Sequence, residues 1–232
     1  MSKPIKRIDM CNGPIFVNVL RYTLPIICTS VLQLLFNAAD LVVVGRFCGS
    51  NSVAAVGATN SLIHLFVNLF IGMGAGVSVA VAYAVGERDD SKISRVIHTA
   101  VPLGVICGAI ITFIGLTFSK PLLHLMGTPN DILPLSSLYT KIYFCGMIPS
   151  LVFEFSAAVC RASGDTKTPL KFLSLSGVIN VLLNVFFVTV IKLDVAGVAL
   201  ATVASQVISC VLMITFLCRR NDNFKLKFIK MN

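Results

Sequence analysis

Two acidic side chains lie inside long apolar stretches of this chain, Asp40 and Glu154. An ionised carboxylate at membrane depth costs at least ~2.5–3.5 kcal/mol, and such residues usually carry function. Asp40 could take up and release a proton there, or give an oxygen ligand to a small cation. Glu154 is a candidate for the same role. The alternative for both is structural, as a cap or a partner of a neighbouring helix.

The spacing around Asp40 indicates a polar face on a helix. Gln33, Asn37 and Asp40 follow one another at intervals of four and three residues. This spacing places all three on one side of an α-helix. We therefore expect Gln33 and Asn37 to support Asp40 on a face that is turned toward the protein interior.

A second set of polar residues lies in apolar stretches further along the chain. Asn180 and Asn184 are one helical turn apart, and Thr202 falls in the following stretch. Amide side chains at this depth hydrogen-bond between helices, for about 0.6–2 kcal/mol. The asparagines could therefore be functional or could only join helices. For Thr202, packing is the simpler interpretation of the sequence.

The elements that must position these residues are long apolar segments with few charges. A hydrocarbon core of about 30 Å requires about 20 residues of helix. Six segments meet this condition. They lie at about 24–44, 53–85, 93–118, 138–160, 169–191 and 196–218. The sequence predicts an all-α polytopic membrane protein, a bundle of six transmembrane helices. Between the third and fourth segments we expect a loop with a short interfacial helix.

The composition supports lipid as the solvent. Only 12% of the residues are charged and 56% are hydrophobic, unlike a soluble domain. The net charge of +9 does not indicate nucleic-acid binding, because the basic residues lie between the apolar segments. Most fall on the side of the amino terminus, so both termini should be cytoplasmic, in a bacterial-type cytoplasmic membrane. Residues 219–232 should form a basic cytoplasmic tail.

No pattern of a catalytic or metal site is found. The eight cysteines include no CxxC pair, and no GxxxxGK[ST] loop is present. We therefore expect no catalytic residue, no metal and no cofactor. The sequence does not favour an enzyme or an ATP-driven pump.

Four ordered motifs carry a family resemblance. They are QLLFNAADLVVVG at 33–45, AAVGATNSL at 54–62, RASGDTKTP at 161–169 and AGVALAT at 196–202. With these motifs the chain resembles, over nearly its whole length, the amino-terminal lobe of bacterial multidrug and toxic compound extrusion (MATE) transporters. The resemblance is greatest to the branch of the DNA-damage-inducible F proteins.

The resemblance implies twelve helices in two six-helix lobes, with a substrate cavity between them. It also implies a cation site in the first lobe, formed by Asp40, Asn180, Asn184 and Thr202. Many relatives carry an acid where Asn184 stands. With a single carboxylate, coupling to H⁺ through Asp40 is favoured over coupling to Na⁺.

The functional hypothesis is half of a cation-coupled antiporter that exports organic cations, drugs or other xenobiotics. Residues 1–218 would be the first lobe and 219–232 the start of the linker between lobes. The partners expected are membrane lipid, a small organic solute and a second six-helix lobe. This lobe would belong to a longer chain or to a second polypeptide. The alternatives are a non-transporting scaffold or inactive fragment and, among transporters, a flippase for lipid-linked substrates.

Overall fold

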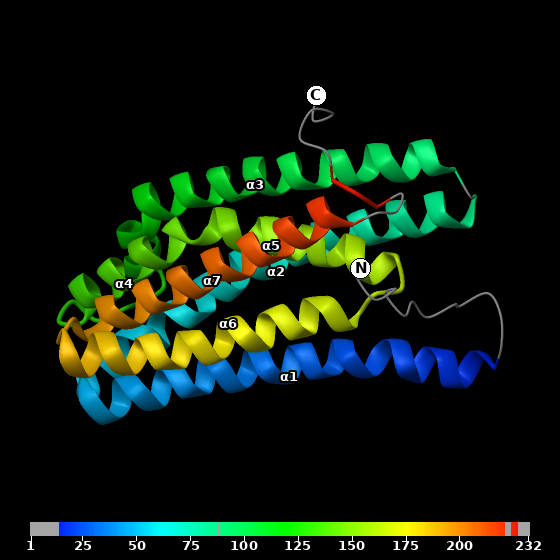
Figure 1. The fold of residues 1–232 in the computed structure, drawn as a ribbon. Coiled ribbons are helices and arrows are strands. Elements are labelled where there is room, and N and C mark those ends of the chain that lie inside the picture. The colour runs from blue at the N-terminus through cyan, green and yellow to red at the C-terminus, as the bar shows by residue number, and fades with distance from the viewer. Residues whose placement is uncertain (1–13, 88, 221–223, 227–232) are drawn as a thin grey trace.

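The structure is a computed structural model, and it describes residues 14–87, 89–220 and 224–226. Throughout these ranges the secondary structure is helical, without strands. The elements in chain order are α1 (Ile15–Phe47), α2 (Ser50–Gly86), α3 (Asp90–Leu125), α4 (Leu133–Cys145), α5 (Met147–Ala162), α6 (Lys167–Val185), the π-helix η1 (Phe186–Val190) and α7 (Asp194–Arg219). Figure 1 shows them side by side as an elongated bundle.

The bundle contains enough long apolar helices to confirm a polytopic membrane protein. Within the described residues, α1, α2, α3, α6 with η1, and α7 are each long and apolar enough to cross a membrane. The helices α4 and α5 form a sixth candidate, bent by 48° at a short break. Gly146 lies at this break, where a larger side chain would collide with Gln206. The predicted six-helix bundle is therefore the observed fold class.

The helices are longer than the segments counted from the sequence. Helix α1 begins at Ile15 instead of about residue 24, and α3 continues to Leu125. A loop with its own short helix was expected after residue 118. Instead α3 runs through Pro121, and a turn at Gly127 leads toward α4. The length of an apolar segment measures only the part of a helix that lies in lipid. The helix itself is longer, because its backbone hydrogen bonds continue beyond that part.

The two ends of the bundle are distinct. The start of α1, the α2–α3 and α5–α6 turns and the end of α7 lie at one end, which we call the proximal end (right in Figure 1). The α1–α2, α3–α4 and α6–α7 turns lie at the other, distal end. There the Ser52 hydroxyl donates to Asp194 Oδ1 at 2.8 Å and joins α2 to α7.

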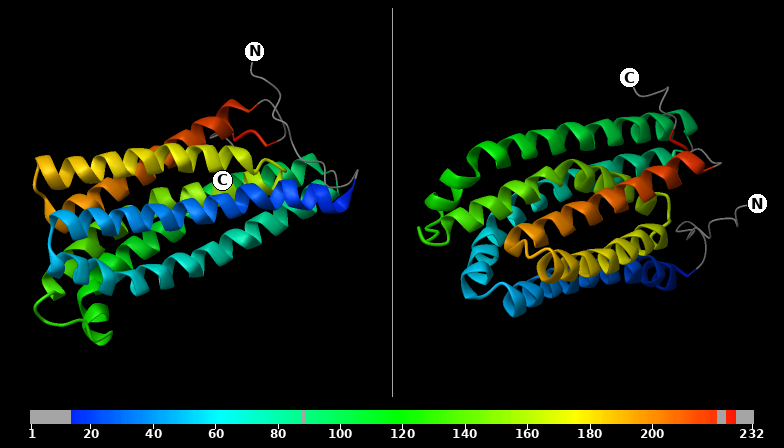
Figure 2. Two further views of the ribbon diagram at one scale, coloured as in Figure 1. Left: turned by 90° about the horizontal axis from the view of Figure 1, so that it is seen from below. Right: turned by 60° about the vertical axis from the view of Figure 1, so that its left-hand side comes forward.

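Two close helix contacts lie at opposite edges of the bundle. Helix α1 lies along α6. The ring of Phe36 on α1 occupies the space that a side chain at position 177 of α6 would need, so glycine is required there. Helix α3 lies on α5 at the opposite edge of the bundle (Figures 1 and 2). A Cβ at Gly108 would be 2.6 Å from the Ile148 Cα, which shows how closely these backbones approach.

The described part of the segment after α7 packs on the proximal end. The Leu226 amide donates to the Leu217 carbonyl at 3.1 Å, and Phe224 and Leu226 are buried. The Arg220 guanidinium lies over the rings of Phe216 and Phe224, at 5.6 and 5.0 Å. This part of the expected tail is thus anchored to the lobe. Residues 221–223 and 227–232 lie outside the described residues.

Candidate ion-binding site and pocket

The structure brings Asp40, Asn180, Asn184 and Thr202 together from three helices. The Asn184 side-chain amide donates to Asp40 Oδ1 and also to Asn180 Oδ1, the latter at 3.2 Å. The Asn180 amide donates in turn to Thr202 Oγ1 at 3.3 Å. A single hydrogen-bonded chain therefore leads from the carboxylate on α1 across α6 to the hydroxyl on α7.

The chain of hydrogen bonds contains one unused acceptor. Asn184 is fully buried, and its Oδ1 atom has no hydrogen-bond partner. A buried acceptor in this condition is uncommon and requires a physical explanation. Both protons of the same amide are already donated, one of them to Asp40. The cluster can therefore accept one further donor or a cation beside the carboxylate.

A change of helical geometry follows directly after Asn184. Residues Phe186–Val190 form a π-helix, in which the Ile191 amide donates to the Phe186 carbonyl at 3.3 Å. Such short π-segments are rare and occur frequently at functional sites. Here the π-helix ends the helix that presents Asn180 and Asn184 and leads into the turn before α7.

Asp40 lies on a pocket of about 420 Å³. The pocket is formed by helices α1, α2, α4, α5, α6 and α7, and its lining combines apolar surface with many uncharged polar side chains. Its amide, acidic and imidazole side chains are Gln33, Asn37, Asp40, Asn60, His64, Asn68, Glu154, Asn180 and Gln206. The predicted supporting residues Gln33 and Asn37 thus share a pocket with Asp40.

The structure places Glu154 in the same pocket but outside the hydrogen-bonded chain that starts at Asp40. Its Oε2 atom is 3.6 Å from Arg161 Nη2, and its Oε1 atom accepts from Gln33 at 3.4 Å. The Tyr22 hydroxyl donates to the Arg161 carbonyl at 3.1 Å. Glu154 therefore joins α1 to α5 toward the proximal end, and Arg161 compensates its charge.

Sequence reasoning missed a set of pocket residues on α2. Asn60, His64 and Asn68 follow one another at intervals of four, all three exposed and all lining the pocket. They form one face of the helix. The periodicity that identified the face of Asp40 would have found them. Within the described residues no group of side chains is found that could hold a metal ion.

Comparison with known proteins agrees with this arrangement. A family model described as MatE matches residues 25–186. The probable multidrug resistance protein YpnP of Bacillus subtilis (strain 168) is 28% identical over 204 residues, covering 87% of this chain and 45% of the relative. The probable multidrug resistance protein YoeA of the same strain is 30% identical over 220 residues, covering 91% and 48%.

Solved structures show the same fold. A MOP superfamily transporter from Pyrococcus furiosus Vc1 superposes with a TM-score of 0.90 at 24% identity, over 100% of this chain and 51% of that one. A crystal structure described as MATE in the bent conformation gives 0.85 at 25% identity, over 92% and 48%. The chain spans about half the length of the curated relatives that it matches. It belongs to the MatE family, the multidrug and toxic compound extrusion transporters.

Proposed function

We propose that this chain forms one lobe of a secondary active antiporter that exports organic, often cationic solutes and is driven by protons that bind Asp40. The observation that carries the proposal is the position of Asp40. It is 8% exposed, hydrogen-bonded to Asn184, and lies on a pocket in a membrane-spanning bundle. A carboxylate with these surroundings can bind either a proton or a cationic solute.

Proton binding would reorganise the hydrogen-bonded chain in a defined way. Ionised Asp40 accepts a hydrogen bond from the Asn184 amide. Protonated Asp40 can instead donate, and the free acceptor beside it is Asn184 Oδ1. Turning the Asn184 amide to present this oxygen would remove its donation to Asn180 Oδ1. One proton on α1 would therefore change the contacts of α6 and, through Asn180, of Thr202 on α7.

The donor set supports H⁺ over Na⁺ as the coupling ion. The four residues supply one carboxylate and otherwise neutral oxygens. A sodium ion here would be held against a single negative charge, whereas a proton needs only the carboxylate itself. No further cofactor or metal is required by this scheme.

The face of α2 supports a second six-helix lobe as a partner. Asn60, His64 and Asn68 are exposed, and a Cβ added at Gly72 or Gly76 would meet no atom within 4 Å. Polar groups facing lipid are costly, and small residues four apart allow another helix to approach closely. This face of α2 is therefore suited to lining a cavity between this lobe and a second one, in which the solute would bind.

The basic residues support an orientation with both termini in the cytoplasm of a bacterial-type membrane. Arg21, Arg95, Arg161 and Lys167 all lie near the proximal end of their helices. An excess of Lys and Arg in connecting segments identifies the cytoplasmic side.

The test is transport in proteoliposomes that contain this chain together with the six-helix lobe that completes it. An imposed pH gradient should drive export of a fluorescent organic cation. Asp40→Asn should lower that rate at least ~10-fold, because the side chain can no longer exchange a proton. Asp131→Asn, an exposed acid of the α3–α4 loop, is the matched control. Unchanged transport in the Asp40→Asn protein would contradict the proposal.

A second candidate function is a non-transporting assembly partner, for which the exposed α2 face of Asn60, His64 and Asn68 would be the docking surface. Mass measurement of the detergent-solubilised chain, paired with the same transport assay, separates the two. A monomer that transports nothing even with a second lobe present supports the assembly role.

A further inference from the structure

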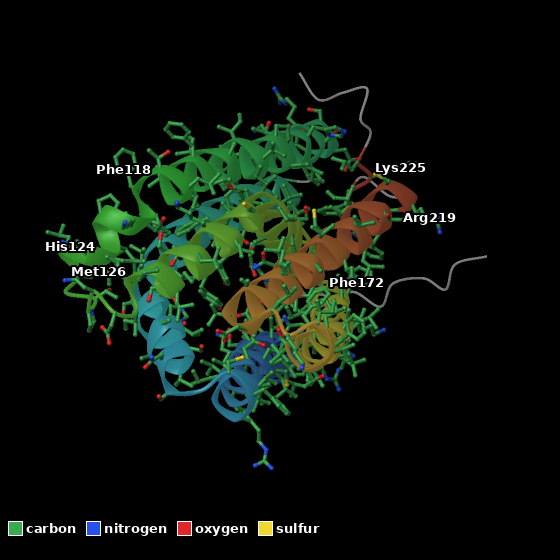
Figure 3. All side chains as sticks on the ribbon, turned by 90° about the vertical axis from the view of Figure 1, so that its left-hand side faces the viewer. Phe118, His124, Met126, Phe172, Arg219 and Lys225 are labelled. Atoms are coloured by element: carbon green, nitrogen blue, oxygen red, sulfur yellow. The ribbon has the colours of Figure 1, made fainter. Side chains whose placement is uncertain are left out.

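A hollow lies at the distal end of α3, away from the pocket of Asp40. It has a volume of about 630 Å³ and is lined by Lys120, Pro121, His124, Leu125 and Leu133. Three of these side chains are apolar, and the other two carry nitrogen donors. Leu133 is buried and forms the base, while Leu125 is 83% exposed at the rim. Figure 3 shows His124 at the edge of the bundle, pointing away from the other helices.

The two nitrogen-bearing side chains continue an apolar stripe on the same face of α3. Ile106, Ile110 and Phe113 are 57%, 50% and 67% exposed. Counting on from Phe113 by four, three and four residues leads through position 117 to Lys120 and His124. Intervals of three and four keep residues on one side of a helix. The stripe therefore runs along the helix surface directly into the hollow.

The depth of the hollow matches the level of lipid headgroups. Residues 96–119 of α3 contain no Asp, Glu, Lys or Arg, and Lys120 is the first charge after them. The distance along the helix from Ile110 to Lys120 is about 15 Å, which equals the ~15 Å depth of one leaflet's hydrocarbon. An acyl chain on the stripe would thus place its phosphate beside Lys120.

Neither nitrogen-bearing side chain has an acidic partner in the part of the chain that the structure describes. Both are exposed, next to a hollow with apolar walls. A Lys or Arg near an anionic membrane surface contributes about 1 kcal/mol of attraction, so Lys120 supplies this contribution and His124 adds a hydrogen-bonding ring nitrogen.

We propose that the hollow binds an anionic phospholipid, with the phosphate held by Lys120 and His124 and one acyl chain along Ile110 and Phe113. The site is separate from the pocket of Asp40 and does not depend on transport. It uses the one part of α3 that extends past the bilayer core at the distal end.

The test is native mass spectrometry of the purified chain with phosphatidylglycerol or phosphatidylcholine, backed by thermal unfolding in both lipids. Phosphatidylglycerol should be retained preferentially. The double substitution Lys120→Ala and His124→Ala should weaken that binding about five-fold or more, which corresponds to ~1 kcal/mol. Arg46→Ala, which removes an exposed cation at the distal end of α1, should leave it unchanged.

Three results would overturn the proposal. The first is unchanged phosphatidylglycerol binding in the double variant, shown to be folded by its unfolding temperature in phosphatidylcholine. The second is equal retention of both lipids by the unaltered chain. The third is equal stabilisation by millimolar inorganic phosphate, which would identify a free anion as the ligand. The milder variant Lys120→Gln provides a check if the double variant does not fold.

Discussion

Asn184 donates both of its amide protons, one to Asp40 and one to Asn180, and keeps an unbonded oxygen. This residue is therefore the point at which the charge on α1 is transmitted to α6. It is also where the chain differs from many members of the family it resembles, which carry an acid here. In the proposed mechanism, a neutral amide at this position leaves Asp40 as the one carboxylate of the site that can bind a proton.

The substitution Asn184→Asp should convert the site into one that binds Na⁺. The new carboxylate would lie beside Asp40 and Asn180, so two negative charges would face the same small space. Like charges in a buried site repel unless a cation lies between them. Thermal unfolding of the variant should shift upward by several degrees in NaCl relative to choline chloride, with little shift in the unaltered chain.

Asn60→Asp is the matched control, because it adds the same charge to the same pocket on an exposed position of α2. A sodium-dependent shift in the control as large as that in Asn184→Asp would show that pocket charge alone is sufficient. No shift in either variant would mean that Asn184 does not contribute to an ion site.

The members of the candidate site could be named from the sequence, but their connections could not. Asp40 was identifiable because acids are rare at membrane depth, and Asn180 and Asn184 because they are amides one turn apart in an apolar segment. The family resemblance then grouped them with Thr202 around Asp40. The direction of each hydrogen bond depends on how α6 and α7 are rotated, which residue spacing does not determine. The ion pair of Glu154 with Arg161, both on α5, was also not predicted. The two residues are seven apart, which is about two helical turns, so their spacing already placed them on one side of the helix.

At the scale of elements, the most extensive helix contact among the described residues is between α3 and α5. Gly108→Val should destabilise the fold by about 1–3 kcal/mol, because its Cβ would lie 2.6 Å from the Ile148 Cα and the backbones must separate. Thermal or denaturant unfolding in detergent would measure this loss. Gly57→Ala is the control, because its added Cβ would have no atom within 4 Å, and should be neutral or slightly stabilising. Equal stability of the two variants would contradict this account of the packing.

The class of fold, a bundle of membrane-spanning helices, could be predicted, whereas the ends and breaks of the helices could not. Apolar runs with few charges follow from the requirement for lipid, so each predicted segment overlaps one or two helices of the bundle. The end of α3 was misplaced because Pro121 and Lys120 resemble a loop in sequence. The break at Gly146 was missed because the apolar run continues across it. Its cause is a side chain of α7, Gln206, which occupies the neighbouring space.

At the scale of the whole molecule, the exposed α2 face should decide whether this lobe can assemble with another. Gly76→Leu should leave the unfolding temperature of the isolated chain within a few degrees, since there is open space at this position. It should lower co-purification with a second lobe several-fold, because a bulky side chain prevents close helix approach. Val79→Leu, at an exposed apolar position of the same helix, is the control. Normal co-purification of the Gly76→Leu chain would place the interface elsewhere.

The position of Asp40 along α1 has a consequence for voltage. Arg46 marks the distal interface and lies six residues from Asp40, a distance of about 9 Å along the helix out of a core of about 30 Å. A proton that reaches Asp40 from the distal side therefore crosses about one third of the membrane field. That corresponds to about 0.7 kcal/mol per 100 mV out of the 2.3 kcal/mol for a full crossing. Proton uptake should respond weakly to membrane potential, and the electrical work of the cycle should fall mainly on release toward the proximal end.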